Sequence, residues 1–226
     1  MGYFIIAGIF SLIGMVVSNR LKSKFARYSN VPLANGRSGA QVAEAMLDHY
    51  GVTGVKIVQG QGMLTDHYNP ATKTVSLSPE VYHGRHVAAA AVAAHECGHA
   101  IQHDTAYAWL QFRSAMVPVV SLAARSQQYL LLFALGMFGV SGGTFLIYLT
   151  IAAFAITTIF SLVTLPVEFD ASDRALVWLE ESRFTRGQEH EGAKDALWWA
   201  AMTYVVAALS SLVILLYLVM SLAGRD

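Results

Sequence analysis

Hydrophobic and polar residues are strongly segregated along the 226-residue chain. Four apolar stretches approach or reach the roughly 20 residues that a helix needs to cross a bilayer. They predict transmembrane helices at residues 1–18, 116–139, 144–165 and 197–222. Charged and turn-forming residues concentrate in two polar segments, 19–111 and 166–196. The pattern therefore predicts a mainly α membrane protein with four transmembrane helices and a polar part.

The charges around the apolar stretches predict that the first one is an uncleaved anchor. A signal peptide carries its positive charge before the apolar part, and a small-residue cleavage site follows it. Here four basic residues come after the stretch, namely Arg20, Lys22, Lys24 and Arg27. The second stretch is interrupted by Arg125 and Gln127-Gln128, and Ser141-Gly142-Gly143 separates it from the third. These two stretches are expected to form a helical hairpin with a tight turn.

The polar segment 19–111 has the pattern of a small α+β domain. Ser38 is expected to cap a helix at residues 39–49. A small sheet is predicted from three β-rich runs at 55–58, 62–65 and 74–77. Pro79 starts a short helix, and the Ala- and Val-rich run 87–101 predicts a buried helix after it.

The last of these helices contains His95-Glu96-Cys97-Gly98-His99, an H-E-x-x-H motif. Two histidines four residues apart project from one helix face and can bind the same Zn²⁺, while Glu96 lies beside them as a base for metal-activated water. Gly98 leaves room for another backbone or a substrate. Cys97 is the only cysteine, so no intramolecular disulfide is expected, and its side chain is expected to face away from the metal. The alternative is a pair of core histidines without a metal.

A catalytic zinc site needs three protein ligands and one open position, so the third ligand must lie elsewhere in the chain. Thr105 stands where the metzincin pattern has its third histidine, so the chain does not follow that pattern. His103 is one turn after His99, but three successive turns of a rigid helix spread over about 11 Å, which is too far for one ion. Glu168 is the best-placed carboxylate, because it follows Pro166 and starts a predicted helix at the membrane surface. Asp170 is the second choice. A solvated helix N-terminus is the alternative for both.

The distribution of charge predicts the orientation in the membrane. Only 13% of residues are charged and the net charge is zero, which argues against nucleic-acid binding. Of the 15 Lys and Arg residues, eight lie in 19–111, four in 166–196 and one at Arg113. Because a hairpin joins the two polar segments, both lie on one side of the membrane, which the positive-inside rule makes cytoplasmic.

Three separated stretches resemble a known family, the YugP-like membrane zinc metallopeptidases. The matching stretches are Leu64–Tyr82, Ala94–His103 and Pro166–Ser172, and the similarity runs through essentially the whole chain. More distantly, the chain is similar to the HtpX-type membrane proteases and the CAAX prenyl proteases. The resemblance implies a membrane-embedded zinc peptidase whose ligands are His95, His99 and Glu168. Glu96 is the implied base.

One position departs from the distant relatives. They usually carry an aspartate four residues after the third ligand, whereas this chain has Ser172 there and Asp173 next. Asp170 and Asp173 are both candidates for a carboxylate that hydrogen-bonds to a metal ligand without binding the metal itself. The oxyanion-stabilising group stays open, and its candidates are His190, Arg174 and Tyr204.

The expected function is that of an integral membrane zinc endopeptidase, which binds unfolded or membrane-associated proteins as an extended strand at the edge of the sheet. The rival interpretation is a catalytically idle zinc-binding scaffold, or an adaptor for another membrane protein. Glu96 favours the enzyme, since a structural site needs no base. The expected partners are the bilayer and a peptide or membrane-protein substrate, and the sequence is compatible with a partner protein or a homo-oligomer. The expected location is the bacterial inner membrane, with the active site facing the cytoplasm.

Overall fold

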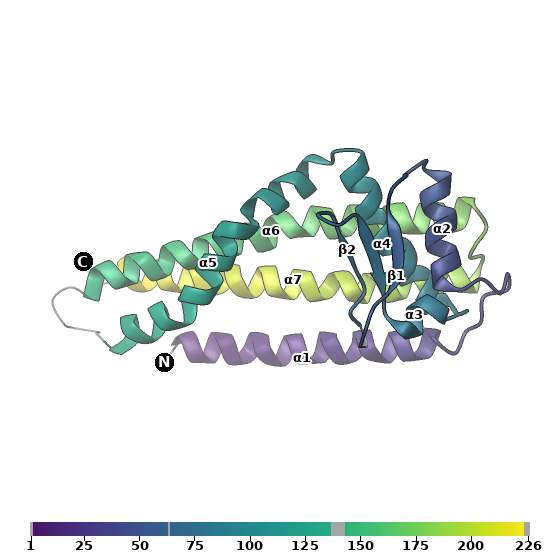
Figure 1. The fold of residues 1–226 in the computed structure, drawn as a ribbon. Helices are drawn as coiled ribbons and strands as arrows, with labels where there is room; N and C mark the ends of the chain where they lie inside the picture. Colours follow the sequence, from purple (N-terminus) through teal and green to yellow (C-terminus); the bar gives the residue numbers. More distant parts are fainter. Residues whose placement is uncertain (1, 63, 137–142, 224–226) are drawn as a thin grey trace. The chain divides into compact units, whose positions relative to one another are not determined.

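The computed structural model describes residues 2–62, 64–136 and 143–223, most of which are helical (Figure 1). The chain divides into two compact units. The apolar unit comprises Met1–Val16, Gln111–Leu165 and Thr203–Asp226. The polar unit comprises Val17–Leu110 and Pro166–Met202, and it contains the H-E-x-x-H motif.

Four long helices account for the apolar stretches. They are α1 (Gly2–Tyr28), α5 (Ala108–Gly136), α6 (Gly143–Glu181) and α7 (Gln188–Ala223). Three segments are long and apolar enough to cross a membrane, namely Gly2–Tyr28, Phe145–Glu181 and Gln188–Ala223. α5 is not one of them, because arginine and glutamine side chains dilute its apolar sequence. Among the described residues there are thus three candidate spans, and the predicted count of four is not confirmed.

The long helices extend beyond the predicted spans into the polar segments. α6 contains Pro166 and continues to Glu181, although proline lacks the amide donor of a regular helical turn. Helices in apolar surroundings tolerate such a proline, because leaving the helix would unpair more backbone groups. Glu168 therefore lies on a continuous extension of the third apolar stretch. In the predicted hairpin turn, Ser141 and Gly142 lie outside the described residues.

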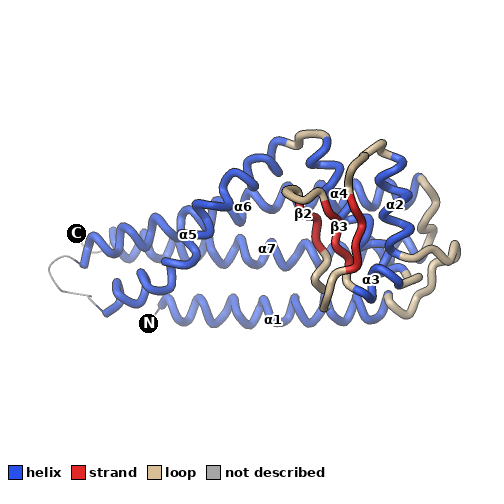
Figure 2. The backbone as a smooth tube through the Cα atoms, in the orientation of Figure 1, coloured by secondary structure: helices blue, strands red, loops and turns tan. Residues whose placement is uncertain are grey.

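The polar unit contains a three-stranded sheet in the order β1-β3-β2 (Figure 2). Its strands are β1 (Lys56–Gln59), β2 (His67–Asn69) and β3 (Thr74–Leu77). β1 runs parallel to β3, and β2 runs antiparallel to it with Tyr68 opposite Val75. β1 and β2 are consequently the outer strands of the sheet.

The predicted strands at 55–58 and 74–77 are confirmed to within one residue, but the one at 62–65 is wrong. Gly62 and Leu64 have positive φ angles of 88° and 55°, which an extended strand cannot accommodate. The Asp66 carboxylate then accepts hydrogen bonds from the amide and hydroxyl of Ser78, at 2.7 and 3.2 Å. These hydrogen bonds hold Asp66 directly before β2, and the second strand starts at residue 67.

The helix with the motif, α4 (Val87–Asp104), packs against α2 (Gly39–His49), the short α3 (Pro79–His83) and the sheet. α2 begins as predicted, with Ser38 in a capping box with Gln41. The many alanines of α4 let these elements approach closely, and most of its residues are buried. Polar side chains on α4 therefore need partners inside the protein.

Candidate metal centre

His95 and His99 lie one turn apart on α4. Their ring centroids are 4.8 Å apart, and the ring planes form an angle of 81°. His99 and Glu96 are buried, and His95 is partly buried. Because α4 is a continuous helix through the motif, the two imidazoles have little freedom to separate.

Glu168 on α6 completes the group. Its Oε2 lies 3.4 Å from Nε2 of His95 and 3.7 Å from Nε2 of His99, and the three candidate ligand atoms all lie within 4.8 Å of one another. Two ligands bound to zinc at about 2.1 Å with a tetrahedral angle lie roughly 3.4 Å apart. Two imidazoles and one carboxylate at these separations fit a zinc ion, and they leave its fourth position for water or substrate.

Gly98, between the two histidines, sets the approach of α6 to α4. A Cβ at this position would lie 2.5 Å from the carbonyl oxygen of Ala171 and 3.0 Å from its Cα. The α6 backbone thus occupies the space that a side chain would need. Glu168 lies one turn before this contact, so the close approach brings its carboxylate to the histidines.

Ser172 orients His95. Its hydroxyl oxygen lies 3.1 Å from Nδ1 of His95, one turn after Glu168 on α6. When Nδ1 donates its proton to the serine, the lone pair of Nε2 faces Glu168, as metal binding requires. Ser172 thus contacts His95 from the position four residues after Glu168. Asp173, the neighbouring carboxylate, is exposed.

Gln102 orients His99, and the sequence reasoning missed it. Its amide nitrogen donates to the Val167 carbonyl and to the Asp170 carboxylate, both at 2.8 Å, so its oxygen faces Nδ1 of His99 at 3.0 Å. Nδ1 must then carry the proton, which leaves Nε2 for a metal. Asp170, the second choice for third ligand, is instead held by Gln102 and Arg174 and lies outside the group. The available signal was a glutamine one turn after His99 on the same helix face.

The electrostatic field of the group favours a cation between its members. Burial alone lowers the pKa of His99, but the hydrogen bond and the charge of Glu168 outweigh burial and raise this pKa above its ordinary value. The negative potential that holds a proton on His99 equally stabilises a metal ion. Cys97 does not take part, because burial raises the pKa of its thiol and Sγ contacts the backbone oxygen of Ala43 at 3.6 Å.

The three oxyanion candidates are distributed over both units. Arg174 is connected to the metal group only indirectly, since its Nε donates to Asp170 at 2.6 Å. His190 lies 3.7 Å from the Glu180 carboxylate. Tyr204 belongs to the apolar unit. Arg174 thus has a hydrogen-bonded link to the group, through Asp170 and Gln102.

The chain is similar to known proteins along nearly its whole length. The model of a family described as "putative neutral zinc metallopeptidase" matches residues 3–223. A curated relative, the "putative membrane protease YugP" of Bacillus subtilis (strain 168), is 44% identical over 208 residues, which cover 92% of this chain and 91% of the relative. No solved structure matches significantly. The chain therefore belongs to the "putative neutral zinc metallopeptidase" family, as the resemblance of its motifs predicted.

Proposed function

We propose that the protein is an integral membrane zinc-dependent endopeptidase. The observation that carries this proposal is the group of His95, His99 and Glu168, together with Glu96, which adjoins His95 on α4. Bound zinc would polarise the scissile carbonyl and lower the pKa of its water toward roughly 7. Membership of the family and the name of the relative support the same activity.

Each residue has a distinct role in this proposal. The three ligands hold the ion, and Ser172 and Gln102 fix the two imidazoles through Nδ1. Glu96 accepts a proton from the attacking water and passes it to the leaving amine, so one water is consumed and two chain ends form. Glu96 suits this role because it adjoins His95 in the helix but is not one of the grouped ligands.

β2 is the proposed docking edge for the substrate. It is an outer strand, it packs against α4, and the hydroxyl of Tyr68 is hydrogen-bonded to Nδ1 of His103 at 2.8 Å. His103 lies one turn after His99, so this bond ties the edge strand to the helix that carries the metal group. A peptide that adds a strand to β2 would pair through its backbone, which reads little of the side-chain sequence. We therefore expect broad specificity for extended or unfolded segments.

The metal group also supports four spans. The histidines precede α5 and Glu168 follows the apolar part of α6, yet their side chains meet. If residues 145–165 of α6 cross the bilayer and bring Glu168 back to the side of the histidines, α6 must begin on the opposite side. The chain can reach that side from α4 only if α5 also crosses the bilayer. α5 must then span the membrane despite its polar residues, and the positive-inside rule places the metal group on the cytoplasmic side.

A zinc-binding scaffold without activity is the competing function. A structural zinc site is usually closed by four protein ligands. Within the described parts of the chain, the group that could hold a metal consists of three residues. A scaffold also has no use for Glu96. The open fourth position and the adjacent carboxylate therefore favour the enzyme.

The activity is tested by cleavage of casein and of a membrane-anchored peptide with the purified full chain in detergent. We expect cleavage that a zinc chelator abolishes and added zinc restores. Activity that survives complete removal of zinc would contradict the proposal, and so would zinc-loaded protein that cleaves neither substrate.

The orientation is tested separately by thiol labelling of intact cells in a Cys97→Ala background. A cysteine placed at Gly36 should resist a membrane-impermeant reagent, whereas one placed at Gly142 should react. The reverse pattern would invert the topology and place the metal group on the outer side.

A further inference from the structure

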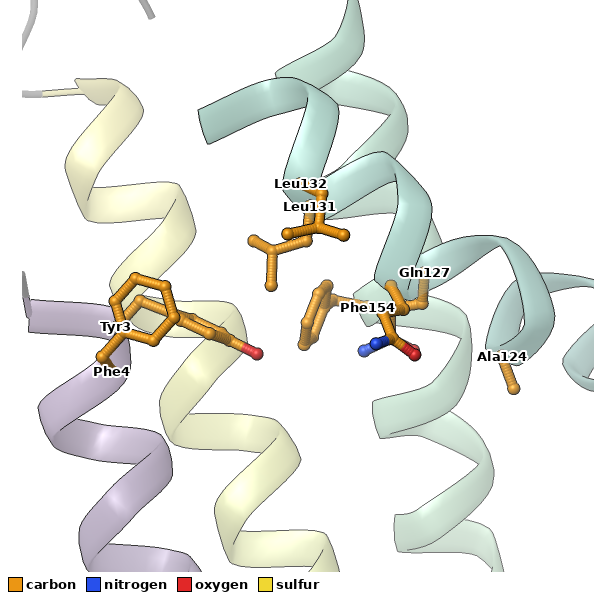
Figure 3. A pocket seen from close by; sticks show the side chains of 8 residues that line it. Tyr3, Phe4, Ala124, Gln127, Leu131, Leu132 and Phe154 are labelled. Atoms are coloured by element: carbon orange, nitrogen blue, oxygen red, sulfur yellow. The ribbon is translucent and has the colours of Figure 1, made fainter. Parts of the chain in front are cut away.

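A cavity of about 370 Å³ lies within the apolar unit, between α1, α5 and α6. Its lining residues are Tyr3, Phe4, Ala124, Gln127, Gln128, Leu131, Leu132 and Phe154. Figure 3 shows the Tyr3 hydroxyl pointing across the cavity toward Phe154, with the Gln127 amide beside the same ring. The cavity thus combines an apolar wall with polar groups from two helices.

The polar groups of α5 lie at an unusual depth for their chemistry. Arg125, Gln127 and Gln128 are near the middle of the predicted span 116–139, where the bilayer offers only hydrocarbon. Charged and amide side chains at this depth are costly and normally face a protein partner or a water-filled cavity. Arg125 and Gln128 are instead exposed on the surface of the described chain.

The chain itself offers these groups little. Gln127 accepts one long hydrogen bond, at 3.4 Å, from the Thr157 hydroxyl on α6. Within the described residues, neither Arg125 nor Gln128 has a hydrogen bond or an ion pair. The sequence contains no Asp or Glu at 1–43, 105–167 or 196–225, so no predicted span carries a carboxylate at the depth of Arg125. A second copy of the chain has the same sequence, so it cannot supply a carboxylate at this depth either.

We propose that this face of α5 and the adjoining cavity bind a membrane-spanning helix of another protein, one that carries an Asp or Glu at mid-membrane depth. The carboxylate would pair with Arg125, and the amides of Gln127 and Gln128 would exchange hydrogen bonds with the same helix. The apolar wall of the cavity would pack against the side chains that flank the carboxylate. A lipid fits less well, because its acyl chains present only CH₂ groups at this depth. The inference rests on the proposed crossing of α5 and is independent of peptidase chemistry.

Binding can be measured with the full chain in phosphatidylcholine vesicles, using energy transfer to labelled synthetic Leu/Ala helices of membrane-spanning length. Three probes differ only at the central residue, which is Glu, Gln or Leu. We expect the Glu probe to bind roughly 5- to 30-fold more tightly than the Leu probe, as is typical of one polar contact between membrane helices. Arg125→Leu should remove this preference, whereas Arg20→Leu, outside the span, should leave it intact.

Equal binding of the three probes to the parent protein would overturn the proposal. It would also be overturned if Arg125 affected only the retention of labelled phosphatidylglycerol, because the occupant would then be a lipid. If Arg125→Leu does not fold, Gln128→Leu serves as the second variant, and it should weaken the Glu and Gln probes alike. None of these readouts requires cleavage, so a failed peptidase assay leaves the result interpretable.

Discussion

Replacing Gly98 with alanine should disrupt the metal group without touching any of its ligands. The new Cβ would lie 2.5 Å from the carbonyl oxygen of Ala171, whereas ordinary contact begins at 3.4 Å. The backbone atoms of α6 cannot rotate away as a flexible side chain would. The two helices must therefore separate by roughly 0.9 Å, the difference between these two distances.

This displacement is large for a metal site and modest for the fold. Metal–ligand distances are held to about ±0.2 Å, so a shift of this size removes Glu168 from bonding distance of an ion held by the histidines. Zinc affinity should fall by more than the roughly 10- to 100-fold that loss of an outer hydrogen-bond partner costs. Overpacking costs about 1–3 kcal/mol, and the better helix propensity of alanine returns about 1 kcal/mol. The free energy of unfolding should therefore fall by at most about 2 kcal/mol.

The assay is a zinc competition titration on folded protein, with a thermal melt of the zinc-free form alongside. Gly14→Ala is the matched control, because a Cβ at that helical position has no neighbour within 4 Å. It should leave zinc affinity unchanged and slightly raise stability. If Gly98→Ala binds zinc as tightly as the parent protein, the close contact with Ala171 does not position Glu168.

Three further predictions concern the surroundings of the metal group. Ser172→Ala should weaken zinc binding by roughly 10- to 100-fold, because His95 loses its Nδ1 partner. Ser182→Ala, just after the end of α6, is the control, because it removes only a bond to the Trp178 carbonyl, and equal zinc affinity in both variants would contradict the role of Ser172. His86 caps α4 through Nδ1, and burial lowers its pKa, so the cap stabilises the fold above a pH of about 6.5 and is lost on acidification. Between pH 7.5 and 5.5, the melting temperature of His86→Asn should therefore fall less than that of the parent protein. Parallel falls in the two proteins would be evidence against the cap. Tyr68→Phe should raise KM for an extended peptide while zinc content stays constant, with Tyr82→Phe as control; an unchanged KM would separate β2 from substrate binding.

The fold was predictable from the sequence where a local rule decides the structure. The cap at Ser38 and the Ala- and Val-rich run of α4 are such cases. The length of α7 was not predictable, because its polar first turns are held by contacts from far along the chain. Asp195 accepts a hydrogen bond from Tyr28 and forms an ion pair with Lys24, both at 2.6 Å. Both partners lie on the polar extension of α1.

The candidate site shows the same division between local and long-range information. The spacing of His95 and His99 is a local signal, so the motif could be interpreted without a structure. Glu168 and Asp170 were harder to separate, since both start the same polar segment. Helical phase separates them, because Glu168 and Ser172 lie one turn apart on the face toward α4. Asp170 is rotated by about 200° from Glu168 and contacts Gln102 and Arg174 instead of the histidines.

The assignment of three zinc ligands and of Glu96 as the base is tested by measuring zinc content and peptide cleavage on the same preparations of two variants. Glu96→Gln should keep stoichiometric zinc and lose cleavage by at least about 100-fold, because the ligands remain and the base is gone. Glu168→Ala should lose zinc and, with it, cleavage. Cleavage by Glu96→Gln at the parent rate, or stoichiometric zinc in Glu168→Ala, would contradict the account.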